Sequence, residues 1–541
     1  MATAGSPEHS VTSASITVER ADVSDGSERE DRSSGAPRRG ADFPSDGGNR
    51  ISTSGYLSKV PSNQVIRVAQ ADDGVAAQTL RDGIHQLQQE LDVTAGFPPE
   101  VEAAAAAAAR SPRLPNLDRT DLPFITIDPP TSMDLDQAMH LARHGDGYTV
   151  HYAIADVAAF VSPGGPIDVE AHKRGESLYG ADSLIPLHPK VISEDAASLL
   201  PGEVRPALLW TIELDADGEG ISAHVERARV RSTAKLDYAG VQQQLDDGTA
   251  SEMLQLLREI GQLRQHIEAK RGGVNLTLPD QEIEVTGDQW RLAFRSQLPV
   301  EEWNAQISLL TGFGAASLMV YARVGVLRTL PPPDPHDVQR LHRTATALGI
   351  DWPAEMLYGD FIRTLDPTNS KHAAMTVACT RLLRGSGYAT FDGELPELSE
   401  HAALASEYAH VTAPLRRLVD RYAGEICVAL CADQPVPDWV HHALPNLPDE
   451  MRSSGRRAAT YERGVTDLVE AGVLAPHVGK TFEGVIVEVD EKAGTRGSVT
   501  LREPAVEAGV SGEEPLPLGT DVTVTLVTAD VATRKVAFRL A

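Results

Sequence analysis

A chain of 541 residues is too long for one small domain, and two to four domains are expected. Its hydrophobic fraction of 41% and charged fraction of 23% are ordinary for a soluble globular protein. The formal net charge of -28 excludes a general nucleic-acid coat protein, because such binding depends on Lys and Arg side chains that neutralise phosphates. A nuclease with a local basic channel is still compatible with an acidic exterior.

The N-terminal part of the chain predicts little globular structure. Residues 1–55 are rich in Ser, Gly, Asp, Glu and Arg and poor in aliphatic residues, so we expect a disordered tail. Residues 56–115 predict a small, mainly helical region. Within it we expect a short strand at 66–71, a helix at 77–91 with apolar residues on one face, and an Ala-rich helix at 100–109.

Three aspartates follow in one short stretch. A β-branched and aromatic segment, 123–128, predicts a strand that ends at Asp128, where two prolines force a turn. Asp134 and Asp136 come within the next eight residues. In isolation such residues could cap turns or be solvated loop charges. They could equally form a site for a hard cation such as Mg²⁺, which takes one or two carboxylates plus substrate phosphates and serves phosphodiester chemistry.

Alternating apolar residues predict further strands. Residues 147–160 indicate a strand or strand pair, with Asp156 near its end. Asp156 could assist the acidic site, or it could cap or form a turn. Residues 207–216 and 221–230 predict antiparallel strands, because an Asp-Gly turn signal at 217–218 joins them. These strands would begin a mixed core of sheet and helix.

The second half of the chain adds helices and a small barrel. Helices are predicted at 253–267, where the apolar stripe belongs to the core, and at 335–350, after a Pro-rich break. From residue 478 to residue 541 short strands alternate with turn signals, as expected for a five-stranded barrel.

Cysteine use and hydropathy bear on location. Cys379, Cys427 and Cys431 show neither metal-ligand spacing nor an even-numbered disulfide framework, which favours a reducing compartment. Cys427 and Cys431 lie four apart in an apolar helical run and are expected in the core. The sequence shows no apolar segment of the kind found in signal peptides and no run of about 18 apolar residues that could span a membrane. It also shows no repeat or coiled-coil pattern that would indicate an oligomer. We therefore expect a cytoplasmic monomer without membrane contact.

Three motifs together carry a resemblance. TIDPPTSMDLDQA at 126–138, HYAIADVAAF at 151–160 and EYAHVTAPLRRLVDRY at 407–422 resemble the catalytic domain of the ribonuclease II and ribonuclease R (RNB) family, in that family's order. The resemblance runs from about residue 118 to about residue 468. It implies an α+β fold, with an RNB catalytic domain at 116–470, whose mixed sheets and helices surround an RNA channel, and an all-β S1-like OB barrel at 478–541.

The resemblance also implies an activity and a catalytic set. The family suggests a 3′-to-5′ exoribonuclease that hydrolyses single-stranded RNA to nucleoside 5′-monophosphates with Mg²⁺, or with Mn²⁺ instead. Asp128, Asp134, Asp136 and Arg416 would be catalytic, with Arg416 on the scissile phosphate, where a guanidinium fork fits two phosphate oxygens. The three aspartates and Gln137 would hold the metal.

RNA contacts are implied at six positions, namely Tyr179, Tyr238, Leu276, Asn304, Arg417 and Glu462. Tyr179 would stack on a base and Tyr238 would lie near a ribose, where a phenol can sense the 2′-OH. Leu276 stands where the family often has a second stacking Phe. Asn304 stands where the family has the first of two Glu residues, unless a shift in the alignment brings Glu301 or Glu302 there. Arg417 could contact backbone phosphates or form an ion pair, and Glu462 would approach the site from a helix.

The motif DLDQ departs from the family pattern. Most well-known relatives have a fourth Asp where this chain has Gln137, and an amide brings no negative charge to a metal. Leu276 also lacks a π-face. These departures admit an alternative, a catalytically weak RNB-like protein that binds RNA. A metal-dependent hydrolase of another kind ranks last, because it leaves Tyr179, Tyr238 and the terminal barrel unexplained.

Overall fold

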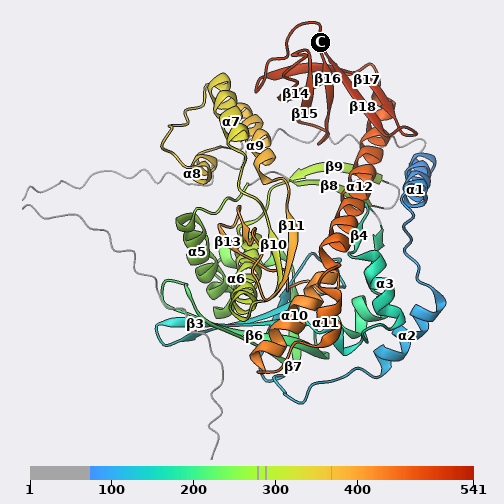
Figure 1. Cartoon of the computed structure of the whole chain (residues 1–541). Coiled ribbons are helices and arrows are strands. Elements are labelled where there is room, and N and C mark those ends of the chain that lie inside the picture. The colour runs from blue at the N-terminus through green and yellow to red at the C-terminus, as the bar shows by residue number, and fades with distance from the viewer. Residues whose placement is uncertain (1–72, 182, 277–279, 287–288, 367) are drawn as a thin grey trace, which may run out of the picture.

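The computed structural model describes residues 73–541 apart from 182, 277–279, 287–288 and 367. The predicted tail at 1–55 and the predicted strand at 66–71 lie outside the described residues. Two closed five-stranded barrels dominate the architecture, and the long helix α12 (Leu447–Leu474) runs from the helices around the first barrel toward the second (Figure 1).

The first barrel contains the acidic stretch. Its strands pair antiparallel from β1 through β2, β3, β6 and β7, and parallel pairing of β1 with β7 closes it. The strands are β1 (Phe124–Ile127), β2 (Gln137–His144), β3 (Gly147–Ala155), β6 (Val204–Leu214) and β7 (Gly220–Leu236). The strands predicted in this region are confirmed, except that the segment at 147–160 leaves the sheet after Ala155 and continues as a 3₁₀ turn, η2 (Val157–Ala159).

Helices cover this barrel and form the largest core with it. Ile154, Trp210, Leu257, Ile307 and Ile426 are among the fully buried members of that core. The helices are α3 (Pro166–Arg174), α4 (Tyr238–Asp246), α5 (Glu252–Arg271), α6 (Pro299–Ala322), α10 (Leu418–Cys431) and α11 (Asp438–Ala443), with a π-helical turn η3 (Val191–Ala196).

Two of these helices bear on expectations from the sequence. The predicted helix at 253–267 is confirmed as α5, which ends where Gly272 adopts a left-handed φ of 89°. Helix α6 is long and apolar enough to span a membrane by length and composition, and half of that stretch is buried against protein. A core helix of a soluble fold has the same character.

The predicted N-terminal helices are confirmed as α1 (Asp73–Glu90) and α2 (Pro99–Arg110). Helix α1 packs along α12 through a buried apolar stripe that includes Leu80 and Leu87. The two helices approach closely at glycines of α12, because a Cβ at Gly472 would lie 2.5 Å from Leu80 Cδ2 and one at Gly464 would lie 2.8 Å from Leu87 Cδ2, so that these leucine side chains would have to shift. The N-terminal region is therefore fitted to α12.

A helical excursion separates two paired strands, β10 (Val324–Thr329) and β11 (Gly387–Asp392). It has a small core of its own, in which Trp352 stacks on Phe361 with ring centroids 4.0 Å apart. The excursion comprises α7 (Pro335–Leu348), which confirms the predicted helix, α8 (Tyr358–Arg363), α9 (Ser370–Cys379) and the 3₁₀ turn η4 (Thr380–Leu383). Short hairpins elsewhere are β4 (Leu178–Tyr179) with β5 (Leu184–Ile185), β8 (Asp280–Thr286) with β9 (Gln289–Arg295), and β12 (Glu400–His401) with β13 (Ser406–Glu407).

The C-terminal barrel confirms the predicted five strands. They are β14 (Thr481–Val489), β15 (Arg496–Leu501), β16 (Glu507–Ser511), β17 (Asp521–Asp530) and β18 (Lys535–Leu540), reached from α12 through a 3₁₀ turn, η5 (Ala475–His477). Phe482 and Phe538 are buried in its core, edge to face at 6.0 Å. These two rings are thus not available for stacking on a nucleotide base.

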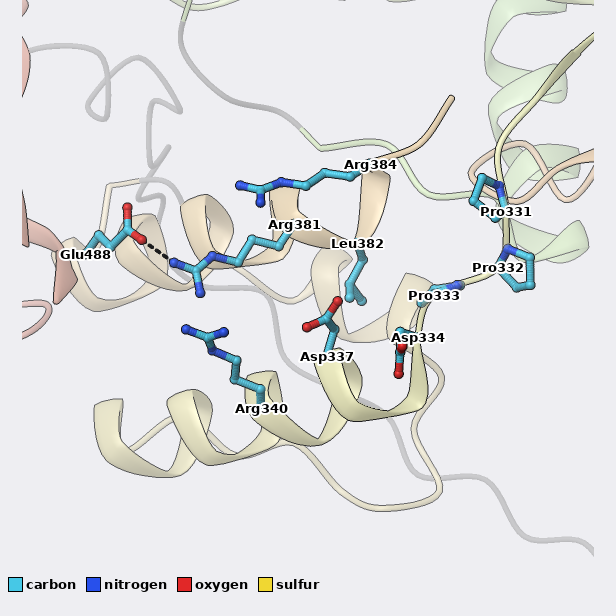
Figure 2. Close-up of a pocket in the computed structure, with 10 residues that line it drawn as sticks. All are labelled: Pro331, Pro332, Pro333, Asp334, Asp337, Arg340, Arg381, Leu382, Arg384 and Glu488. Atoms are coloured by element: carbon cyan, nitrogen blue, oxygen red, sulfur yellow. Dashed lines mark hydrogen bonds and ion pairs between the residues drawn. The ribbon is translucent and has the colours of Figure 1, made fainter. Parts of the chain in front are cut away.

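The helical excursion docks on this barrel. Helix α9 packs on β14, and a cavity of about 510 Å³ lies between the two parts. Figure 2 shows Arg381 reaching across it to Glu488 of β14, with Arg340 of α7 beside them. Arg340 itself pairs with Glu491 of the barrel at 2.5 Å. Since Asp334, Asp337 and Glu488 also line the cavity, its charges are of both signs, and we read it as a polar junction.

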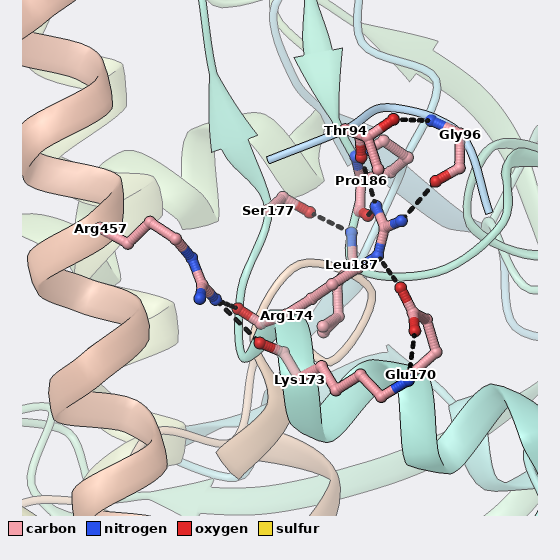
Figure 3. A network of polar contacts seen from close by, with 9 residues as sticks. All are labelled: Thr94, Gly96, Glu170, Lys173, Arg174, Ser177, Pro186, Leu187 and Arg457. Atoms are coloured by element: carbon pink, nitrogen blue, oxygen red, sulfur yellow. Dashed lines mark hydrogen bonds and ion pairs between the residues drawn. The ribbon is translucent and has the colours of Figure 1, made fainter. Parts of the chain in front are cut away.

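Arg174 at the end of α3 ties four segments together (Figure 3). Its Nε donates to Glu170 Oε1 at 3.0 Å, and its Nη1 donates to the carbonyls of Thr94 at 3.1 Å and Pro186 at 3.0 Å. Arg457 of α12 donates to the carbonyls of Lys173, at 2.9 Å, and of Arg174. The N-terminal segment, α3, the β4–β5 hairpin and α12 thereby share one polar network.

Replacement of Arg174 by Met is expected to lower the free energy of unfolding by about 3 kcal/mol, because it breaks a nearly buried ion pair and removes the donors to the carbonyls of Thr94 and Pro186. Urea denaturation followed by circular dichroism measures this. The matched control is Lys173→Met. Lys173 pairs with the same Glu170, but its side chain is 67% exposed, so the loss of unfolding free energy should stay below about 1 kcal/mol. Equal effects of the two substitutions would contradict the role of Arg174.

Candidate active site

The acidic loop is held between two strands of the first barrel. Asp128 follows β1, and its backbone N–H donates to Leu236 O of β7 at 3.0 Å. The Asp136 carbonyl, just before β2, accepts from Ala155 N–H at 2.9 Å. Between them Lys235 donates to Pro130 O at 2.8 Å. Strand pairing in the barrel and the hydrogen bond from Lys235 therefore determine the position of the carboxylates on the loop.

Ser198 holds the other side of the loop. Its hydroxyl donates to Met133 O at 2.6 Å and accepts from Leu135 N–H at 3.0 Å. Asp134 lies between these two attachment points in sequence. Sequence patterns identified neither Ser198 nor Lys235, because each acts on the loop from a distant segment.

Asp136 is the most enclosed of the three carboxylates, with 4% of its surface exposed. Its Oδ1 accepts from the backbone N–H of Leu415 at 2.8 Å, and its Oδ2 lies 3.6 Å from Arg416 Nε. Burial raises the pKa of Asp136 to about 8, although Arg416 and the Leu415 N–H both favour the ionised form. One half-exposed guanidinium thus only partly offsets the cost of desolvation.

Asp128 and Asp134 add negative charge beside it. Burial raises the pKa of Asp128 to about 6, and the charge of Asp134 acts in the same direction. Burial likewise raises the pKa of Asp134. The Oδ2 atom of Asp128 is buried and has no hydrogen-bond partner among the described residues. A cation at this place would stabilise all three carboxylates.

The donor set fits a hard divalent cation. All three side chains offer oxygen, the ligand that Mg²⁺ prefers, and Asp128 Oδ2 has no protein partner in the described part of the chain. Within that same part, no group of three or more His, Cys, Asp or Glu side chains is close enough to hold a metal alone. The arrangement therefore suits an ion whose coordination is completed by water and by phosphate oxygens of a ligand.

Gln137 has protein partners at both ends of its amide. Nε2 donates to Thr412 O at 2.6 Å, and Oε1 accepts from the Tyr152 hydroxyl at 3.3 Å. The sequence predicted this side chain as a fourth metal ligand. In the structure the side chain joins β2 to the segment that carries Arg416.

The adjacent arginines have different surroundings. Arg416 has a side chain 46% exposed beside Asp136. Of the two roles expected for Arg417, the structure favours the ion pair, because its guanidinium forms a bidentate pair with Asp420, including a contact of 2.7 Å from Nη2 to Oδ1. Asp420 is almost fully buried. The two hydrogen bonds hold this guanidinium against Asp420 through Nε and Nη2.

Asp156 stands at a turn, one of the two roles expected for it, since its backbone carbonyl accepts from Ala159 N–H at 3.0 Å where η2 begins. It is buried and pairs with Arg227 Nε at 2.9 Å, and Arg227 contacts Glu425 of α10 as well. Its side chain makes no cap hydrogen bond on η2. The Asp156 side chain therefore links β3 to β7 and α10, while its backbone takes part in the turn.

Tyr179 lies close enough to the acidic site to interact with its charges, and Glu462 lies within the same range of Tyr179. Tyr179 on β4 is 42% exposed. Partial burial raises the pKa of its phenol, on which the charges of Arg416, Asp134, Asp136 and Glu462 also act. An exposed aromatic ring therefore lies within electrostatic reach of the catalytic candidates.

Tyr238 and Asn304 form a second pair near the site. Asn304 Nδ2 of α6 donates to the Tyr238 hydroxyl at 3.2 Å. Burial raises the pKa of Tyr238 to about 12, and the charge of Asp128 contributes. Leu276 lies elsewhere, since it packs against the small core of the helical excursion, which includes Trp352.

Sequence patterns missed one further acid. Glu176, three residues before Tyr179, has a buried Oε1 without a hydrogen-bond partner among the described residues. Burial raises the pKa of Glu462, and the charge of Glu176 acts in the same direction. A single Glu beside a short strand gives no signal of such burial.

The family of the chain follows from its similarity to known proteins. Residues 117–431 match the RNB domain, and residues 480–541 match the RNase II-type exonuclease C-terminal S1 domain. The first match alone covers more than half of the 541 residues, so the chain belongs to the RNB family. The fold class expected from the sequence is thereby confirmed.

Individual relatives carry ribonuclease names. Ribonuclease R 1 of Lactococcus lactis subsp. lactis is 25% identical over 453 residues, which are 78% of this chain and 53% of that protein. Ribonuclease R of Escherichia coli is 25% identical over 420 residues, which are 73% of this chain and 50% of that protein. The chain thus spans about half the length of these relatives.

Solved structures show the same fold. Mycoplasma genitalium RNase R in complex with ribose-methylated single-stranded RNA matches with a TM-score of 0.76 at 20% identity, over 86% of this chain and 78% of that one. Yeast Ssd1, described as a pseudonuclease, matches with a TM-score of 0.62 at 14% identity, over 80% of this chain and 55% of that one.

Proposed function

We propose that this protein is a 3′-to-5′ exoribonuclease that hydrolyses single-stranded RNA to nucleoside 5′-monophosphates. One observation carries the proposal: Asp136 is buried next to a half-exposed Arg416, with Asp128, Asp134 and the exposed ring of Tyr179 around them. Membership of the RNB family and relatives named ribonuclease R support it.

We further propose that Asp128, Asp134 and Asp136 hold Mg²⁺ or Mn²⁺ together with water and RNA phosphates. Such an ion, when bound, activates a water nucleophile and offsets charge on the scissile phosphate. Asp128 Oδ2, buried without a hydrogen-bond partner in the described residues, supports this assignment.

The chain's own residues would bind and orient the RNA. Arg416 would bind phosphate oxygens, and its half-exposed guanidinium beside Asp136 supports this role. Tyr179 would stack on a base near the 3′ end, a contact worth about 1–3 kcal/mol that is independent of sequence. The Tyr238 hydroxyl, paired with Asn304, would contact a ribose. We also propose a cytoplasmic monomer that acts on RNA without a membrane.

A second candidate is a catalytically weak RNB-like protein that binds RNA. Gln137 in place of an acid favours it, and so does the shared fold with yeast Ssd1, a pseudonuclease. The presence of Asp128, Asp134, Asp136 and Arg416 favours the exoribonuclease.

One degradation assay separates the two candidates. The full chain is incubated with a 5′-labelled single-stranded RNA in Mg²⁺ or chelator, beside the matching DNA and an RNA with a blocked 3′ end. We expect a ladder that shortens from the 3′ end in Mg²⁺ only, with no cleavage of DNA. Binding without shortening would reject the exoribonuclease in favour of the RNA-binding protein.

A further inference from the structure

The amide of Gln137 bridges two segments that meet at the acidic site. Gln137 begins β2 directly after Asp136, and its Nε2 donates to Thr412 O at 2.6 Å. Its Oε1 accepts from the hydroxyl of Tyr152, which is fully buried and also hydrogen-bonds Ser308 Oγ of α6 at 2.8 Å. A buried phenol thus orients the amide so that its NH₂ group faces Thr412.

The segment 412–417 carries Arg416 and is held at several points. The N–H of Ala413 donates to Asp420 Oδ1 at 2.8 Å, and the N–H of Leu415 donates to Asp136 Oδ1 at 2.8 Å. The bond from Gln137 holds Thr412, where the segment begins. Two neighbouring residues of the acidic stretch, Asp136 and Gln137, therefore fix the same segment at two points.

The residue type at 137 follows from the groups that surround it. The Thr412 carbonyl can only accept a hydrogen bond, and an ionised carboxylate can also only accept. An Asp or Glu at 137 would set two acceptors against each other in a partly buried place, whereas an amide supplies a donor to Thr412 and an acceptor to Tyr152 together.

We propose that Gln137 is a positioning residue, whose amide fixes the segment 412–417 and thereby the guanidinium of Arg416 relative to Asp136. Its consequence for the reaction rests on the proposed function, in which Arg416 binds the scissile phosphate. The bridge to Thr412 does not depend on that function. If Gln137 instead ligates a metal ion through Oε1, a carboxylate at 137 should strengthen metal binding.

The test compares the full chain with Gln137→Glu, which keeps the length of the side chain and removes the donor. We expect kcat on single-stranded RNA to fall about 10- to 100-fold, since a displacement of about 1 Å in a phosphate-binding group costs that much. KM should change less than about threefold, and the Mg²⁺ concentration for half-maximal activity less than about twofold.

Hydrogen exchange supplies a readout without RNA or metal. Peptides that cover 411–417 should exchange about tenfold faster in Gln137→Glu, the effect of losing one hydrogen bond. Gln137→Met removes the donor without adding charge and should show the same increase in exchange. It is the control for an effect of the added charge of Gln137→Glu on folding. The matched control is Gln255→Glu in α5, where Nε2 donates to Ala250 O at 2.9 Å, and here both kcat and exchange at 411–417 should be unchanged.

Two results would overturn the proposal. One is unchanged exchange at 411–417 in both Gln137 variants. The other is a Gln137→Glu protein with undiminished kcat and a lower Mg²⁺ requirement, which would make Gln137 a metal ligand. If the unsubstituted chain fails to degrade RNA, the proposed function is wrong, and the exchange experiment still decides whether Gln137 positions the segment.

Discussion

Asp136→Asn is expected to reduce the degradation of single-stranded RNA by at least about 10³-fold while leaving RNA binding nearly intact. Asparagine keeps the shape of the side chain, and its carbonyl oxygen can still accept from Leu415 N–H. It removes the negative charge that faces Arg416 Nε at 3.6 Å and the metal proposed for the site. Rates from the 5′-labelled ladder and Kd values from filter binding measure the two effects separately.

The control for Asp136→Asn is the same substitution at Asp360. That carboxylate is 59% exposed and pairs with Arg363 at 2.9 Å, so the rate should change less than about twofold. Unchanged degradation by Asp136→Asn would remove Asp136 from the catalytic set. Loss of binding together with activity would point instead to a role in holding RNA or in folding.

Arg416→Met and Arg417→Met are expected to have opposite consequences. Arg416→Met should lower kcat/KM about 10²- to 10³-fold, because a guanidinium placed to bind phosphate is lost. The free energy of unfolding should change by less than about 1 kcal/mol, since the side chain is 46% exposed. Activity on labelled RNA and urea denaturation provide the two measurements.

Arg417→Met should instead lower the free energy of unfolding by about 3–5 kcal/mol, because it leaves the buried Asp420 without its partner. Asp420 also accepts from Ala413 N–H, so a secondary loss of activity is expected, but stability distinguishes the two positions. A large stability loss in Arg416→Met, or none in Arg417→Met, would reverse the two roles.

Much of the fold could be predicted because its determinants are local. The strands around the acidic stretch, the helices α1, α2, α5 and α7, and the five terminal strands all show their own periodicity or turn signals. The two prolines after Asp128 likewise indicate a loop that holds three carboxylates together. Periodicity does not identify catalytic residues. The candidates were assigned from the three motifs, which occur in the order of the family.

The polar partners of individual side chains could not be predicted. Arg417 and Arg416 are neighbours in sequence, yet one is buried against Asp420 and the other is half-exposed beside Asp136. The sequence placed Asp156 near the end of a strand, where its side chain could have served the acidic site. In the structure this side chain is an ion-pair partner of Arg227. Sequence spacing does not show which of two adjacent side chains turns inward, because that depends on what packs above them.

The sequence by itself thus determined many of the elements, the acidic loop and the resemblance to the family, since each of these depends on contiguous motifs. Only the tertiary structure decided what the polar side chains do. Gln137 meets Thr412 across 275 positions of sequence, and Asn304 meets Tyr238 across 66. Such hydrogen bonds form because barrel closure and helix packing bring distant segments within about 3 Å of each other, and no local pattern encodes that distance.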